Sequence, residues 1–170
     1  MERDIISLYK ETVGSLLAAA DSFSRETFNQ VPFEGSWTAA QVLVYITKSN
    51  LSVAGVLSWQ GEPAHRPPDE RVKELGDIFL DFTTRLKSPD FILPEPGIYE
   101  KEILLQNLQH SITRIYNEAD RADLSEAVKH PIFGDITRLE LLYFVTYHTR
   151  RHINQLNNIL KYVSTCQTVS

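Results

Sequence analysis

Two histidines, His148 and His152, stand four residues apart near the end of the sequence and are the side chains best suited to chemistry. In an α-helix, residues at this spacing lie about 40° apart, one turn above each other, so both imidazoles can reach one divalent ion. Five apolar residues fall on the same helical face: Leu141, Val145, Leu156, Ile159 and Val163. Both rings are therefore expected to point into the protein interior, where a polar ring needs a bonding partner. That partner is either a metal ion or a polar group of a facing helix, and the pair alone leaves both interpretations open.

The histidine pair needs a rigid frame, and apolar residues at helical spacing predict one made of helices. We expect four long helices, over residues 4–28, 38–59, 99–119 and 137–163, with a shorter accessory helix over residues 69–86. Capping boxes open the second and the last of these helices, because Thr38 can pair with Gln41 and Thr137 with Glu140. Segments rich in proline and glycine separate the helices, residues 130–135 form a turn, and no convincing strand alternation is found.

The predicted fold is therefore all-α, an antiparallel up-down four-helix bundle with an extra short helix between the second and third long helices. A chain of 170 residues and 19.4 kDa suits one domain. We assign residues 1–163 to a single bundle domain and residues 164–170 to a polar C-terminal tail. Cys166, the only cysteine, lies in that tail, and its thiol is interpreted as incidental.

Charge and hydropathy exclude several classes of partner. The formal net charge is −5, and the densest basic spot is the pair Arg150 and Arg151, interpreted as surface charges, which argues against a nucleic-acid partner. No apolar run approaches the roughly 20 residues of a membrane span, so no membrane association is expected. The first residues lack the basic-then-apolar layout of a signal peptide, which predicts a cytoplasmic protein.

Three segments together resemble the DinB-like (YfiT-type) superfamily: residues 37–45, residues 130–142 and residues 148–156. The resemblance implies a four-helix bundle, usually a homodimer, in which many members hold a divalent metal, zinc or nickel, with three histidines. It also implies a possible activity class, since characterised relatives include transferases and isomerases that use a low-molecular-weight thiol such as bacillithiol, mycothiol or glutathione.

Carried over to this chain, the last two ligands of the resemblance are His148 and His152, and the first position is Tyr45, eight residues after Trp37. Tyr45 shares a helical stripe with Ser49 and is expected to face the histidines if the helices pack as in the family. A phenol with a pKa near 10 is a poor ligand unless the metal lowers that pKa, and it can instead donate a hydrogen bond to an imidazole.

Three states of the site follow from Tyr45. The metal is held by two histidines, water and Tyr45; or a carboxylate from another helix supplies the third ligand; or the site holds no ion. The other histidines, His65, His110 and His130, are interpreted as surface or structural residues.

Two functions fit this sequence. The first is a divalent-metal-dependent thiol transferase or hydrolase acting on a small-molecule substrate between the second and last helices, where the metal lowers the pKa of a bound thiol or water. The alternative is a metal-free bundle that binds a small molecule or a protein partner.

Overall fold

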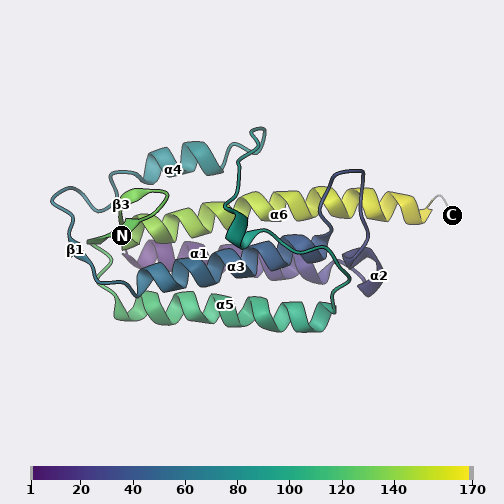
Figure 1. Ribbon diagram of the computed structural model, residues 1–170, viewed down its shortest axis with the longest axis horizontal. Coiled ribbons are helices and arrows are strands. Elements are labelled where there is room, and N and C mark those ends of the chain that lie inside the picture. The colour runs from purple at the N-terminus through teal and green to yellow at the C-terminus, as the bar shows by residue number, and fades with distance from the viewer. Residues whose placement is uncertain (1, 169–170) are drawn as a thin grey trace.

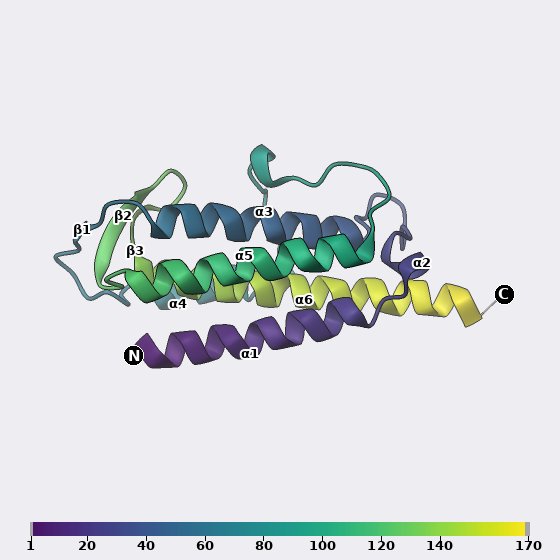
Figure 2. The same cartoon turned by 90° about the horizontal axis from the view of Figure 1, so that it is seen from below.

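A computed structural model of the protein describes the backbone of residues 2–168 and the side chains of residues 4–164. The four long helices are α1 (Glu2–Asp21), α3 (Ala39–Leu57), α5 (Lys101–Arg121) and α6 (Arg138–Thr168). They lie side by side in one bundle (Figures 1 and 2). The short helix α4 (Val72–Phe79) lies between the second and third long helices, so the prediction of a four-helix bundle with one extra helix is confirmed.

The long helices run in the order up, down, down, up (Figure 2), so the predicted up-down alternation does not hold between α3 and α5. The connection over residues 58–100 returns the chain along the full length of the bundle, so that α5 starts at the same end as α3. Parallel neighbours therefore form two pairs, α3 with α5 and α1 with α6, and α3 also packs on α6. This last contact places Tyr45 on α3 opposite the histidines on α6.

Several predicted helix ends were wrong. The helix expected over residues 4–28 is two helices, α1 and the short α2 (Arg25–Phe28), because Ser24 forms a capping box with Thr27 and starts a new helix. Helix α4 is shorter than the predicted 69–86, and α6 continues past Val163 to Thr168. Cys166 lies outside the residues whose side chains are described.

A small antiparallel sheet closes one end of the bundle, although no strand was predicted. Its strands β1 (Glu62–Pro63), β2 (Glu126–His130) and β3 (Gly134–Thr137) lie in the order β1-β2-β3. Val128 pairs with Ile136, and both side chains are buried against the helices. The strands are two to five residues long, too short for an alternating pattern to stand out in the sequence. The predicted turn over residues 130–135 connects β2 to β3.

Two local predictions about the helices are confirmed. Both capping boxes form, with reciprocal bonds between Thr38 and Gln41 and between Thr137 and Glu140. The apolar face of α6 is buried as expected, and each residue on it is at most 2% exposed: Leu141, Val145, Leu156, Ile159 and Val163. None of the described helices combines the length and apolar composition that a bilayer crossing requires.

Candidate functional site

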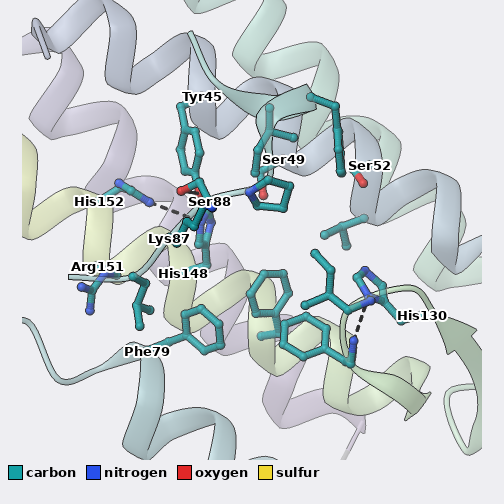
Figure 3. Close-up of a pocket in the computed structure, with 18 of the residues that line it drawn as sticks. Tyr45, Ser49, Ser52, Phe79, Lys87, Ser88, His130, His148, Arg151 and His152 are labelled. Atoms are coloured by element: carbon teal, nitrogen blue, oxygen red, sulfur yellow. Dashed lines mark hydrogen bonds between the residues drawn. The ribbon is translucent and has the colours of Figure 1, made fainter. Parts of the chain in front are cut away.

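A cavity of about 500 Å³ opens between α3, α6, the β2–β3 turn and residues 80–98, a segment that we call the strap. This volume is within the usual range of small-molecule sites. Figure 1 shows the strap crossing α6 and α3. The polar groups that line the cavity include Tyr45, Ser49, Ser52, Ser88, His130, His148, Arg151 and His152 (Figure 3).

The two histidines of α6 lie at one end of this cavity, facing Tyr45 of α3 (Figure 3). Their side chains are inward, since His148 is 5% exposed and His152 8%. The two Nε2 atoms are 3.2 Å apart, and the Tyr45 Oη lies 3.2 Å from the His148 Nε2. Three polar atoms from two helices therefore converge on one small region.

Neighbouring side chains define how these groups share their protons. The His152 Nδ1 lies 2.8 Å from the Gln155 Oε1, an amide oxygen that only accepts, so the proton of His152 is on Nδ1 and its Nε2 carries a lone pair. In the absence of an ion, His148 can donate its Nε2–H to that lone pair or to Tyr45. Its Nδ1 is buried and has no hydrogen-bond partner among the described side chains.

Burial keeps all three groups neutral at pH 7. It lowers the pKa of His148 well below 6.5, with a further lowering from nearby His152, and it lowers the pKa of His152 to about 4. Burial also raises the pKa of the Tyr45 phenol, although its hydrogen bond with Ser88 acts in the opposite direction. Neutral imidazoles are the form that binds metal ions.

The strap is fastened to the helices around the cavity. The Ser88 hydroxyl is 2.8 Å from the Tyr45 Oη. Arg151, interpreted from sequence as a surface charge, is half-buried and donates to the carbonyl oxygens of Asp81, at 2.7 Å, and Thr84. The stripe of Tyr45 and Ser49 is buried as well, and both residues line the cavity.

Aromatic side chains form one wall of the cavity, and sequence reasoning did not identify them. Phe79, Phe133 and Phe144 make a cluster, with ring centroids 4.9 Å apart for Phe79 and Phe144 and 4.8 Å apart for Phe133 and Phe144. They come from α4, the β2–β3 turn and α6, so no single helical period contains them. His130 also lines the cavity and was missed, whereas His65 and His110 are exposed as predicted.

The histidine pair fits a metal ion in two respects. Two ligands about 2.05 Å from a tetrahedral ion lie about 3.3 Å apart, close to the separation of the two Nε2 atoms. Gln155 also accepts a hydrogen bond from the Nδ1–H of His152, as the partner of a metal-binding histidine normally does.

The position of a third metal ligand fits less well. His148 lacks such a partner on its Nδ1, and the remaining nearby donor is the phenol of Tyr45. Among the described residues, no His, Cys, Asp or Glu side chain joins the pair to make a group of three. The donor set therefore suits an ion held by two imidazoles, with the Tyr45 phenol as the third protein group.

Replacing Tyr45 by phenylalanine is expected to lower the free energy of unfolding by about 1–2 kcal/mol. The hydroxyl joins Ser88 of the strap to His148 of α6, and its loss removes both interactions from a site with little water access. Urea unfolding measures the effect, with Tyr162→Phe as the matched control because Tyr162 is 52% exposed. Equal unfolding midpoints for the two variants contradict a bridging role.

Comparisons with known proteins agree with this architecture. A family model described as the DinB superfamily matches residues 8–156. An uncharacterised protein of Bacillus subtilis (strain 168), YuaE, is 24% identical over 147 residues, or 80% of this chain and 85% of the relative. The crystal structure of TT2238, a four-helix bundle protein, has a TM-score of 0.63 and 19% identity, covering 93% of this chain and 99% of that one. The likeness to TT2238 bears on the fold alone.

Proposed function

The chain belongs to the DinB superfamily, and we propose that it binds one divalent metal ion, zinc or nickel, between α3 and α6 and acts on a small molecule as a transferase or hydrolase. The observation that carries the proposal is the convergence of His148, His152 and Tyr45 at the end of a cavity large enough for a substrate. His148 and His152 hold the ion through their Nε2 atoms. When bound, such an ion lowers the pKa of a coordinated thiol or water to near neutrality.

The chain's own residues supply the rest of the site. The neutral Tyr45 phenol, oriented by Ser88, is placed to donate a hydrogen bond to a group bound beside the histidines. Phe79, Phe133 and Phe144 make one wall of the cavity apolar, and a low local dielectric strengthens the polar interactions beside it. We propose a low-molecular-weight thiol as the co-substrate, because a coordinated thiol becomes a thiolate nucleophile at neutral pH.

The proposal is tested by titrating the metal-free protein with zinc and with nickel and following binding by calorimetry. We expect about one ion per chain for the wild type. His148→Ala and His152→Ala each remove one of two imidazole ligands and should abolish binding, whereas His110→Ala, at an exposed position on α5, should leave it unchanged. Gln155→Leu should weaken binding by about 10–100-fold, because Gln155 orients His152.

A Tyr45→His variant separates the proposal from its alternative. This variant is expected to bind metal under both the metal-dependent function and the metal-free alternative, since it restores a third imidazole. If the wild type binds no ion while Tyr45→His does, the metal-dependent function is wrong and the metal-free alternative holds. The observation that favours this alternative is the buried Nδ1 of His148, which lacks the acceptor that a metal-binding histidine normally has.

A further inference from the structure

His130 lies at the other end of the cavity from the histidine pair (Figure 3). It ends β2, and its Nδ1 lies 3.0 Å from the backbone nitrogen of Ile132 and 3.2 Å from that of Phe133. Both backbone groups are N–H donors, so the Nδ1 must accept with its lone pair. The β2–β3 turn thereby fixes the proton of the neutral ring on Nε2.

The Nε2–H group of His130 is available to a ligand. The residue is half-buried, its ring lines the cavity, and its Nε2 has no hydrogen-bond partner within the described part of the chain. Burial lowers the pKa of His130, which keeps the ring neutral at pH 7. A neutral imidazole with its proton held on one nitrogen is a directional donor.

Aromatic rings occupy the space between His130 and the histidine pair. The centroid of Phe133 is 4.9 Å from that of His130 and 4.8 Å from that of Phe144, and Phe144 is 5.4 Å from His148. One ion cannot bridge two histidines separated by two phenylalanines. A molecule that reaches both ends must therefore place an apolar part against this wall.

We propose that His130 is a second ligand-binding residue, which donates its Nε2–H to an oxygen acceptor at the far end of an elongated apolar or aromatic molecule whose other polar end meets His148 and His152. The inference deepens the proposed function, since it names the substrate class of the same cavity. It requires that the cavity takes a small molecule, and it does not require the metal.

Two probes that differ only at the far end test this inference. They are 4-phenylbutyrate and 4-(4-acetylphenyl)butyrate, which share a phenyl ring for the wall and a carboxylate that can accept from the His148 Nε2–H and the Tyr45 phenol. The acetyl oxygen is the acceptor for His130. One neutral hydrogen bond predicts that the acetyl compound binds the wild type about 3–10-fold more tightly, with or without zinc.

The variant His130→Asn isolates the donor. The Asn side-chain oxygen can still accept the backbone N–H groups of the turn, whereas its amide nitrogen falls at the place of the ring Cδ2, one bond short of the lost Nε2–H. We expect this variant to bind both probes equally, while His110→Asn keeps the preference of the wild type. The NMR signals of the His130 ring nitrogens should show a protonated Nε2 in the free protein and a shift of that nitrogen with the acetyl probe.

Each of the following results would overturn the inference about His130 and leave the proposal of metal binding unaffected. A preference that survives in His130→Asn, or a free ring protonated on Nδ1, contradicts the role of His130. Failure of both probes to bind at millimolar concentration contradicts the ligand class. The metal proposal is decided separately, by zinc and nickel binding to the His148→Ala and His152→Ala variants.

Discussion

Replacing Glu140 by alanine is expected to lower the free energy of unfolding by about 3–5 kcal/mol. The carboxylate side chain is fully buried at the start of α6. It accepts two bonds from the Arg66 guanidinium, at 2.6 and 2.8 Å, and one each from the backbone N–H groups of Arg71, at 2.8 Å, and Thr137, at 2.9 Å. The alanine leaves a half-buried cation and two amides without their acceptor.

The loss of Glu140 should also loosen the part of the cavity that carries His130. Arg71 also donates to the carbonyl oxygen of Phe133, at 2.7 Å, and so ties the segment before α4 to the turn that carries His130. Loss of Glu140 loosens this attachment together with the start of α6. Urea unfolding gives the free energy, and amide hydrogen exchange over residues 66–72 and 130–137 shows whether this region opens first.

Glu74 provides a matched control for Glu140. It is 56% exposed and pairs with Arg71 at 3.3 Å, so Glu74→Ala should cost less than about 1 kcal/mol. Similar costs for Glu74→Ala and Glu140→Ala contradict the role assigned to the buried carboxylate. Burial raises the pKa of Glu140, but the bonds from Arg66 and the two amides outweigh burial and give a net lowering. The stabilisation is therefore present at neutral pH and lost only in acid, below the ordinary pKa of 4.5.

In the metal-free protein, the free energy of unfolding is expected to fall by about 4 kcal/mol between pH 7 and pH 5. In the unfolded chain His148 and His152 titrate near 6.5, whereas in the folded protein burial lowers the pKa of His152 to about 4 and that of His148 well below 6.5. Between these values the unfolded state binds more protons, so stability rises with pH. Each histidine contributes about 2 kcal/mol to this fall, because the slope reaches its limit of about 1.4 kcal/mol per pH unit only below pH 6.5.

Urea unfolding of metal-free protein at pH 7, 6 and 5 measures this dependence. A double variant, His148→Leu with His152→Leu, should lose most of it, because the buried titrating groups are gone and Tyr45 keeps its bond to Ser88. His110→Leu should retain it, since His110 is exposed. The assignment is wrong if the double variant loses as much stability between pH 7 and pH 5 as the wild type.

The sequence by itself determined the features that depend on neighbours along the chain. Helical periodicity identified the four long helices, and the apolar residues around His148 and His152 correctly predicted that both rings point inward. The capping boxes of Thr38 and Thr137 were also recognised, because each involves residues only three apart. All these features arise within one or two helical turns, where spacing alone defines which side chains meet.

Tertiary structure alone decided what surrounds the histidine pair. Tyr45 meets His148 across 103 residues of sequence, a contact that only the family resemblance led us to expect, and Ser88 across 43, a contact that nothing in the sequence predicted. Arg151 looked like a surface charge, but the strap covers part of its side chain, which donates to the carbonyl oxygens of Asp81 and Thr84. Such contacts depend on how a long connection returns over the bundle, and this is fixed by packing between distant segments rather than by the propensities of any one segment.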